Sequence, residues 1–557
     1  MSNIKFFALG GLGEVGKNIY ICDCDNQIFI LDAGLKFPNS ELLGVDNVYP
    51  NINYLIENED RIAGLFLTHA HDENIGAAIE IIKKFNIKVF GSFFTLSVLE
   101  SRIEDEGLNV SDYKLYKINE TKTLKFDSAT VEFYFVCHNI PETANIAIVT
   151  NDGAFVYAPD FTFDIINDKR YRINFDKITS IGRSGVLALA CGSMGVNNVN
   201  GTHNNNALEY NVSQLAMKDK RIIISMYSTD LIKLQRVINI CMSYNRRVAI
   251  FGRKTQRLIS SALTHKYFYV DEAKLINLRF MDDINQNKDK DLAIIVTGER
   301  HEPYFSIQRM CRGLDKLIKI DSDDEVLFIA PVDANCERIA SRAMDEILMA
   351  GAKYYYMREE ELRSGYADGE ELKILYDMLK PKYLIPIVGE YRHQFVHRKI
   401  ALQYGFKDRD IVMLENGDVL EIENGNIKSI EKGKIECGDV LVDGSFVGTN
   451  VNDVVLRDRE LLSEEGIIVV SILINKTKKE IIDGPIVKSS GYIFEDGEPT
   501  IDDLKNEAIK FMDLYFKMVI DNTGPSCNEL LRDYLLRYMF PKIQKRPIIV
   551  PGVIAII

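Results

Sequence analysis

Two of the chain's eight histidines stand beside two carboxylates in the run His69-Ala70-His71-Asp72-Glu73-Asn74. Imidazole and carboxylate groups are ligands that zinc commonly takes in proteins. The apolar stretch 62–67 predicts a strand that ends just before this run, and a helical spacing of apolar residues begins near Asn74. We therefore expect the polar residues on a loop at the end of a strand, where functional sites are usually built.

Two later strands are expected to end at polar residues of the same kinds. His138 follows the apolar stretch 131–136, and Asp160 follows the stretch 154–157. If the strand ends converge, His69, His71, His138 and Asp160 offer three imidazoles and one carboxylate, a set suited to zinc. The alternative is a cluster of histidines held by hydrogen bonds without a metal.

The run 11–16 matches the pattern GxGxxG, and Asp32 lies beyond it. A dinucleotide site needs a helix directly after these glycines, because the helix N-terminus holds the pyrophosphate. Here a strand over 18–22 is expected instead. The pattern therefore predicts a glycine hairpin.

The composition is that of a soluble globular protein, with 557 residues, 46% of them hydrophobic and 27% charged. This length predicts two to four domains. Nine scattered cysteines without a CxxC pair indicate reduced thiols, and we expect a cytoplasmic protein with no membrane segment. The net charge of −14 argues against non-specific coating of nucleic acid, so any nucleic acid would have to bind a local patch.

The pattern of elements changes twice along the chain. After the Asn-rich run 196–206, buried strands near 222–225, 248–251, 293–296 and 326–330 alternate with helices, which predicts a parallel α/β sheet. One of these helices is expected to be capped by Asn335 and to end before Gly351. The last hundred residues predict a separate α+β domain.

Several motifs along the chain occur together in one known family. They are the runs 10–18, 31–38, 137–141, 380–383, 389–393 and 546–551, with Thr297-Gly298 before Glu302-Pro303. On these motifs the chain resembles the ribonuclease J family of the metallo-β-lactamase superfamily. The resemblance implies an α/β fold, namely a metallo-β-lactamase αββα sandwich with an inserted parallel α/β β-CASP domain and a C-terminal α+β domain. The expected parts are 1–200 and 356–435 (metallo-β-lactamase), 201–355 (β-CASP), 436–450 (linker) and 451–557 (C-terminal domain).

The family implies a ribonuclease that acts from the 5′ end of RNA with two zinc-type ions. The first-metal ligands His69, His71 and His138 and the bridging Asp160 are present. The second-metal positions depart from the family, which has Asp where Glu73 stands and His where Asn74 and Val388 stand. Glu73 is the candidate catalytic base, unless Asp72 moves into the place of the family Asp.

Other family positions depart as well. Gly192 stands where an acidic residue is expected, and Ile232 where a histidine is expected. The phosphate-binding motif reads Leu362-Arg363-Ser364-Gly365-Tyr366 and has lost both of its histidines. The residues expected to contact RNA phosphates are Arg253, Arg363, Ser364, Gly365 and Tyr366, and Arg300 is a further channel candidate.

These departures predict at most one zinc ion and weak or absent nuclease activity, because a two-metal hydrolase uses both ions at the scissile phosphate. The chain then resembles the weaker member of a ribonuclease J pair, a protein of RNA processing and decay that assembles with an active paralogue or with itself. The helix with Leu530, Leu531, Tyr534, Leu535 and Tyr538 is either its assembly surface or an internal core face. The alternatives are an active single-metal exoribonuclease or endoribonuclease that uses Glu73, and an RNA-binding regulator without a paralogue.

Overall fold

A computed structural model describes most of the chain, and its contacts separate into two units. The first comprises residues 1–37 and 47–440, and the second comprises residues 38–46 and 441–557. No helix among the described residues is long and apolar enough to span a bilayer. The described residues are 2–38, 42–166, 168–198, 205–252, 258–259, 262–276, 289–330, 332, 336–358, 361–443, 446–447, 453–492, 494, 499–517, 526–543 and 547–556.

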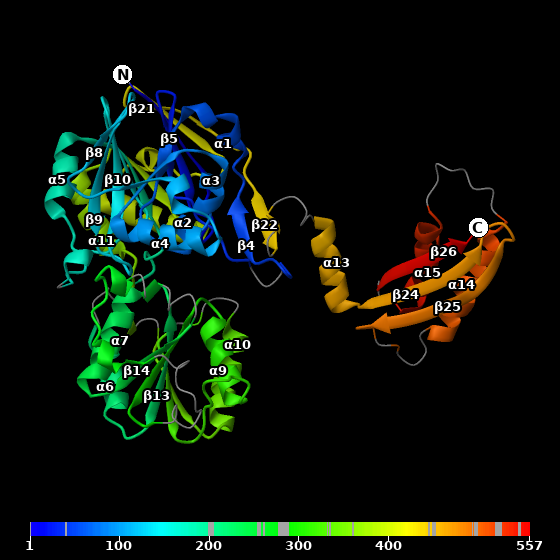
Figure 1. The fold of residues 1–557 in the computed structure, drawn as a ribbon. Coiled ribbons are helices and arrows are strands. Elements are labelled where there is room, and N and C mark those ends of the chain that lie inside the picture. The colour runs from blue at the N-terminus through cyan, green and yellow to red at the C-terminus, as the bar shows by residue number, and fades with distance from the viewer. Residues whose placement is uncertain are drawn as a thin grey trace. The chain divides into compact units, whose positions relative to one another are not determined.

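Two sheets pack face to face in the first unit (Figure 1). Along β1 (Asn3–Gly10), Phe6 points between the sheets while Phe7 points to the outer helices, as the alternation of side chains along a strand requires. The eight-stranded sheet has the order β21 (Asn426–Glu431), β20 (Val419–Glu423), β1, β2 (Ile19–Cys24), β3 (Gln27–Leu31), β5 (Ile62–Phe66), β6 (Lys88–Gly91), β7 (Lys114–Lys117). The six-stranded sheet has the order β19 (Tyr383–Ile387), β12 (Val186–Gly192), β11 (Gly153–Ala158), β10 (Thr143–Thr150), β9 (Thr130–Val136), β8 (Thr123–Lys125).

Helices cover the outer face of each sheet. Those on the first sheet are α1 (Asn53–Glu57), α2 (Asp72–Ile75), α3 (Ala78–Lys84) and α4 (Phe93–Asp105). Those on the second are α5 (Phe175–Ser184), α11 (Gly369–Leu379) and α12 (Tyr391–Tyr404). The expected αββα sandwich is confirmed. The run 11–16 joins the antiparallel strands β1 and β2, so the predicted glycine hairpin is also confirmed, and Gly11, Gly13 and Gly16 have φ values of +96°, +71° and +89°.

The chain leaves the sandwich after β12 and returns before α11. Strands β12 and β19 pair in parallel, with Cys191 opposite Pro386. The inserted segment forms a third sheet in which every pairing is parallel, as predicted. Its order is β15 (Leu275–Ile276), β14 (Arg247–Phe251), β16 (Leu292–Gly298), β13 (Arg221–Tyr227), β17 (Asp324–Phe328), β18 (Lys353–Tyr356). Helices α6 (Asn205–Ala216) and α7 (Leu231–Ser243) cover one face, and α9 (Glu302–Cys311) and α10 (Glu337–Met349) cover the other (Figure 1). The expected cap of α10, Asn335, lies outside the described residues.

The second unit is the expected α+β domain. Strand β24 (Ile467–Asn475) lies between antiparallel β25 (Glu480–Ser490) and parallel β26 (Ile548–Ile556). Helices α14 (Ile501–Tyr515) and α15 (Cys527–Ile543) cover one face of this sheet, and α13 (Asp453–Glu464) precedes it. Leu531 and Leu535 are completely buried against the sheet, and Leu530, Tyr534 and Tyr538 pack beside them. This face of α15 is therefore an internal core face, not an assembly surface. The remaining strands are β4 (Asn47–Pro50), β22 (Asp439–Asp443) and β23 (Phe446–Val447).

A buried guanidinium holds the inserted sheet together at one end. Arg246 is almost fully buried and donates to the backbone carbonyls of Leu215, Ala216, Lys218, Lys220 and Lys290. These carbonyls lie at the end of α6 and just before β13 and β16. Because buried carbonyls need partners, Arg246 satisfies the chain at three element ends at once.

We predict that Arg246→Ala lowers the free energy of unfolding of the inserted domain by roughly 3 kcal/mol, since five backbone carbonyls lose a donor and two of them, those of Leu215 and Ala216, belong to buried residues. The neighbouring Arg247 makes half-exposed ion pairs with Asp289 and Asp291, so Arg247→Ala is the matched control and should cost about 1 kcal/mol or less. Hydrogen exchange of the β13 and β16 peptides measures both changes. Equal loss of protection in the two variants would contradict the prediction.

Candidate metal centre

Three strand ends deliver the predicted ligands to one place. The loop after β5 carries His69 and His71, the loop after β9 carries His138, and the loop after β11 carries Asp160. All four side chains are buried. Among the described residues, one group of potential ligand atoms lies within 4.8 Å of one another, and it consists of the three imidazoles. The predicted convergence of the histidines is therefore confirmed.

The inner nitrogens of the three rings point at each other. His69 Nε2 lies 3.0 Å from His71 Nδ1, and His138 Nε2 lies 3.2 Å from the same atom. The rings are nearly perpendicular to one another. Tetrahedral zinc with Zn–N bonds of about 2.0–2.1 Å holds its ligand nitrogens about 3.3 Å apart, which is close to this spacing.

The outer nitrogens of the same rings are each bonded to an oxygen. His71 Nε2 lies 3.1 Å from the Thr229 carbonyl, and His138 Nδ1 lies 2.6 Å from the Gly365 carbonyl. A carbonyl only accepts, so both outer nitrogens carry the ring hydrogen. The inner nitrogens of these two rings are then bare lone pairs. Such outer bonds are typical of histidines that ligate a metal.

The third ring is oriented through Thr68. The Thr68 hydroxyl lies 2.8 and 2.9 Å from the two carboxylate oxygens of Asp32 and 3.0 Å from His69 Nδ1. Because the hydroxyl has one hydrogen and gives it to the carboxylate, it accepts from His69 Nδ1. The inner nitrogen of His69 is bare as well, so three lone pairs converge.

The three rings do not readily take up protons that would lie between their facing nitrogens. Burial lowers the pKa of His69 and of His138 well below the ordinary value, and it lowers the pKa of His71. The neighbouring imidazoles lower the pKa of His69 and of His138 further. A metal cation shared by the three nitrogens fits the arrangement, because it supplies the positive charge that the buried rings do not take up as protons.

The Asp160 carboxylate lies at the edge of the triad. One of its oxygens is 3.7 Å from His69 Nε2, and the other is buried without a hydrogen-bond partner. Burial, followed by the charges of Glu73 and Asp32, raises the pKa of Asp160 well above its ordinary value. A buried carboxylate with an unused oxygen beside three bare imidazoles fits a metal ligand.

Asp32 supports the centre from behind, and the sequence patterns did not single it out as a site residue. Its backbone is left-handed, with φ of +60°, and its buried carboxylate accepts from Thr68, Asn74 and Tyr157. Burial outweighs these bonds and raises the pKa of Asp32 to about 6. The available signal was the polar Asp32-Ala33-Gly34 turn directly after the apolar strand 28–31.

The expected second-metal positions have other surroundings. The Asn74 amide nitrogen donates to Asp32 at 2.8 Å, and its amide oxygen lies 3.4 Å from the Asn18 amide nitrogen. Both ends of this side chain are therefore engaged inside the protein. The charge of Glu73 raises the pKa of Asp160, after the larger effect of burial. Asp72 instead forms an ion pair with Arg102.

Val388 is buried among apolar side chains of the inter-sheet core, and its backbone is left-handed, with φ of +52°. This conformation crowds the Cβ of a β-branched residue and costs on the order of 1–2 kcal/mol. Neighbouring contacts hold it in place. The Val388 amide donates to the Tyr20 hydroxyl at 3.2 Å, and Gly389 and Glu390 form bridges with Glu14 and Gly13 of the glycine hairpin.

The expected phosphate-contacting residues divide into two groups. Gly365 accepts from His138, and the Tyr366 ring lies 5.6 Å from the His138 ring, so both lie at the centre. The Tyr366 amide donates to the Ser364 hydroxyl. Arg363, by contrast, is buried and bonded to Asp164, Cys137 and Thr162. Contact of any of these residues with RNA stays a prediction.

The two remaining departures from the family, Gly192 and Ile232, and the two remaining arginine candidates, Arg253 and Arg300, lie as follows. Arg253 is outside the described residues. A Cβ at Gly192 would lie 1.7 Å from the Pro159 carbonyl oxygen, so this backbone has no room for an acidic side chain. Ile232 is buried in α7. Arg300 is partly exposed, with φ of +48°.

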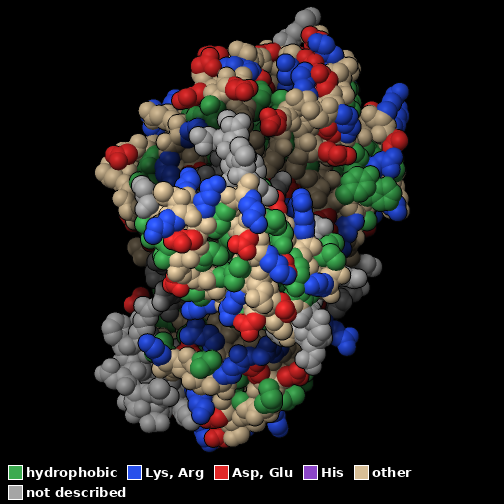
Figure 2. Space-filling view, turned by 90° about the vertical axis from the view of Figure 1, so that its right-hand side faces the viewer, with side chains coloured by type: hydrophobic (Ala, Val, Ile, Leu, Met, Phe, Trp, Pro, Cys, Tyr) green, Lys and Arg blue, Asp and Glu red, His purple; other side chains and the backbone are tan. Residues whose placement is uncertain are grey.

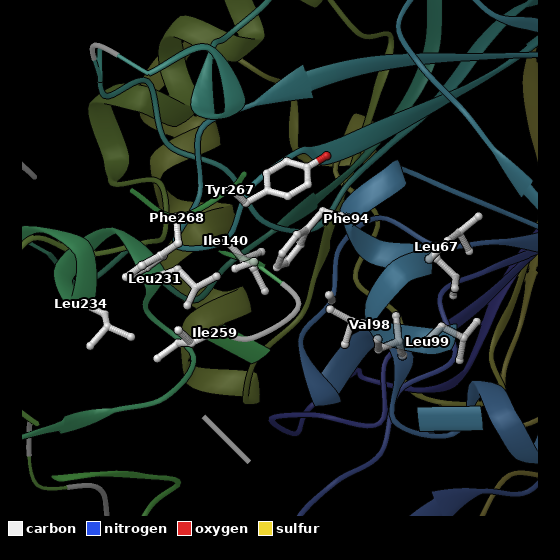
Figure 3. Close-up of a cluster of buried hydrophobic side chains, with 14 of the residues drawn as sticks. Leu67, Phe94, Val98, Leu99, Ile140, Leu231, Leu234, Ile259, Tyr267 and Phe268 are labelled. Atoms are coloured by element: carbon white, nitrogen blue, oxygen red, sulfur yellow. The ribbon is translucent and has the colours of Figure 1, made fainter. Parts of the chain in front are cut away.

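The inserted domain takes part in the centre through backbone groups. Thr229, which accepts from His71, precedes α7, and the Leu231 amide donates to the carbonyl of Asn139, next to His138. Next to these hydrogen bonds, buried apolar side chains of the inserted domain and of the sandwich belong to one cluster (Figure 3). In it the Tyr267 ring lies 4.9 Å from the Phe94 ring, and the Tyr267 hydroxyl donates to Glu142.

Comparison with known proteins assigns the family. The ribonuclease J β-CASP domain matches residues 219–347, and the ribonuclease J C-terminal domain matches residues 454–556. Ribonuclease J2 of Bacillus subtilis (strain 168) is 33% identical over 556 residues, with 99% of this chain and 98% of the relative covered. The chain belongs to the ribonuclease J family. Proteins named Ribonuclease J 2 from Staphylococcus saprophyticus and Staphylococcus epidermidis are 31% and 30% identical, again over 99% of this chain and 98% of the relatives.

We predict that this ribonuclease J family member binds close to one equivalent of zinc and that His138→Ala lowers the zinc content, because one of the three imidazole ligands is lost and the remaining groups hold the ion more weakly. Elemental analysis after dialysis of the purified full chain measures the stoichiometry. His301→Ala, a change at an exposed histidine of the inserted domain, is the matched control and should retain the metal. Equal zinc in the His138→Ala and His301→Ala variants would contradict the assignment.

Proposed function

We propose that this ribonuclease J family member works in RNA processing and decay in the cytoplasm as a subunit with little or no nuclease activity, assembled with an active ribonuclease J paralogue. The observation that carries the proposal is the contrast between the two metal positions. The three imidazoles of the first are complete and oriented, whereas at the second Val388 offers no ligand atom and Asn74 is engaged by Asp32 and Asn18. Deleting one ion of a two-metal hydrolase removes several catalytic contributions together.

In this proposal one zinc ion is held by His69, His71 and His138, with Asp160 as the fourth ligand. A zinc ion with four protein ligands has the form of a structural site, because catalytic sites keep one position for water or substrate. When bound, zinc supplies a Lewis-acidic positive charge. Thr68, Thr229 and Gly365 orient the rings. Asp32 accepts the hydrogen of the Thr68 hydroxyl, so this hydroxyl accepts from the outer nitrogen of His69.

An active partner is inferred because the chain lacks second-metal ligands but keeps the domains of its relatives. Alignment with the three relatives over nearly their whole length leaves the RNA-associated architecture intact. The relatives carry the number 2 in their names, which fits a second member of a set. On the face drawn in Figure 2, Lys and Arg side chains are interspersed with Asp and Glu among the described residues, so RNA contact is expected at local patches.

A single-metal nuclease is the second candidate, and one observation favours it. After burial, the charge of Glu73 is the next cause that raises the pKa of Asp160, so this carboxylate acts on the Asp160 side of the triad. In this candidate, Glu73 is the general base that accepts a proton from the attacking water. In that case the nuclease activity of the unmodified chain would depend on Glu73.

Recovery from the native cell tests the assembly. The tagged chain should bring down a second ribonuclease J family protein in about equal amount, because a subunit without its own chemistry acts through an active partner. Mass spectrometry of the eluate gives the ratio, and an unrelated tagged cytoplasmic protein is the control. Recovery of the chain without any paralogue would overturn the proposed partnership.

A second prediction concerns the lost ligands. The chain itself should show weak or no turnover of 5′-monophosphorylated RNA with zinc or manganese, and a variant combining Glu73→Asp, Asn74→His and Val388→His should gain turnover. The backbone supports the last change, because histidine is enriched over β-branched residues at positive φ. An imidazole at position 74 would lie beside the Asp32 carboxylate, which would accept a hydrogen bond from one ring nitrogen as it now accepts one from Asn74.

His71→Ala in the same triple background is the control and should abolish the gained turnover. Rapid turnover by the unmodified chain that is lost in Glu73→Gln would instead establish the single-metal nuclease and overturn the inactive-subunit proposal. Zinc content measured on every variant shows whether the first position stays loaded.

A further inference from the structure

Helix α12, which directly follows the Val388 loop, turns an aromatic and basic stripe outward. Tyr391 is 60% exposed and Phe395 is 38% exposed, and Arg392 and Lys399 are exposed beside them. Residues 391, 395 and 399 are spaced by four, so they lie along one side of the helix. We call Tyr391, Arg392, Phe395 and Lys399 the α12 outer face.

The two rings of the α12 outer face form a stacked pair. Their centroids are 6.3 Å apart, and their planes differ by 23°. Lys399 Nζ lies 4.7 Å from the centroid of the Phe395 ring. The opposite side of the helix is buried, with His393, Gln394, His397 and Ala401 among its inward residues. The helix therefore anchors these aromatic side chains in place, and they are not loose surface residues.

The charge of α12 differs from that of the whole chain. The chain has 81 Asp and Glu residues against 67 Lys and Arg, whereas residues 391–404 contain Arg392, Arg398 and Lys399 and no carboxylate. Arg392 pairs with Glu390, and Arg398 pairs with Asp408, in both cases between partly or largely exposed groups. Exposed ion pairs of this kind are weak, so a phosphate can replace the carboxylate.

The α12 outer face begins three residues after Val388. Glu390, which precedes the helix, forms a bridge with Gly13 of the glycine hairpin, and the hairpin exposes the side chain of Val15. The loop that holds the former ligand position thus continues directly into the exposed aromatic pair. A chain of nucleotides bound along α12 would therefore begin beside the loop that carries Val388 and the glycine hairpin.

We propose that the α12 outer face is a stacking platform for single-stranded RNA. Unpaired bases stack on aromatic side chains whatever their sequence, and neighbouring cations bind the backbone phosphates. A double helix keeps its bases stacked inside and offers no free base faces to Tyr391 and Phe395. A carboxylate-free helix in an acidic protein favours this polyanion over an acidic protein surface, which would gain no stacking.

The proposal rests on the proposed role in RNA metabolism, but it needs neither metal nor nuclease activity. The platform gives a subunit without a second metal ion a means to hold RNA. It also places RNA contact on residues 391–399, at a distance along the chain from Arg363, whose guanidinium is bonded inside the protein.

Fluorescence anisotropy of a short labelled oligouridine, titrated with the full chain at one fixed salt concentration, tests the platform. The variant Tyr391→Ala/Phe395→Ala should bind about tenfold more weakly or worse, because each stacked base loses its aromatic partner. The conservative variant Tyr391→Phe/Phe395→Tyr keeps both rings and should bind like the unmodified chain. Tyr210→Ala, at a 65% exposed tyrosine of α6, is the matched control and should have no effect.

Two further measurements complete the test. Lys399→Glu should weaken binding and make it less steeply dependent on salt, because one phosphate contact is lost. Unlabelled duplex RNA should compete poorly with the labelled single strand. Unchanged thermal unfolding of each variant shows that the exposed substitutions leave the fold intact.

The outcomes separate the two proposals. If the unmodified chain binds RNA and Tyr391→Ala/Phe395→Ala binds equally well, the platform is wrong and the role in RNA metabolism stands. If that variant keeps its RNA affinity but no longer recovers the paralogue, the α12 outer face is a protein interface and the platform is again overturned. If the unmodified chain binds no RNA at all, both proposals fall.

Discussion

Three imidazole nitrogens without hydrogens face one another: His69 Nε2 and His138 Nε2 lie 3.0 and 3.2 Å from His71 Nδ1. Much of the surrounding structure holds the three rings in this arrangement. Each ring is fixed by an oxygen on its outer side, and these oxygens come from a side chain, from the inserted domain and from the returning chain near residue 365. Burial lowers the pKa of His69 and His138, so these rings do not take up protons readily, and three lone pairs facing one another are an arrangement that suits a metal cation. The geometry of the candidate metal centre therefore depends on three separate parts of the chain, each of which orients one ring.

The sequence was sufficient to predict that three histidines converge, because polar residues at the ends of apolar strands indicate a site. His69, His71 and His138 meet as expected, and the αββα sandwich with its parallel insert follows the predicted order of elements. The supporting oxygens were not predictable in the same way. Thr229 and Gly365 contribute backbone carbonyls, which leave no mark on residue type, and they lie far from the rings along the chain.

Some sequence expectations depend on burial, which residue type alone does not give. Arg363 was expected to face phosphate, yet the structure places its guanidinium in the interior with Asp164. The amphipathic spacing of α15 fitted both an outer surface and a core face, and only the position of β24 decides for the core. The left-handed backbone at Val388 was also hidden, because valine is among the residues least suited to it.

The hydrogen bond between His71 and the Thr229 carbonyl has a consequence for the whole first unit. Thr229 belongs to the inserted domain, and the neighbouring Leu231 amide holds Asn139 beside His138. An ion that binds the rings best in their present orientation therefore also favours the present seating of the inserted domain. By thermodynamic reciprocity, whatever stabilises that seating raises affinity for the ion by the same factor. Metal binding and the seating of the inserted domain would therefore be thermodynamically linked.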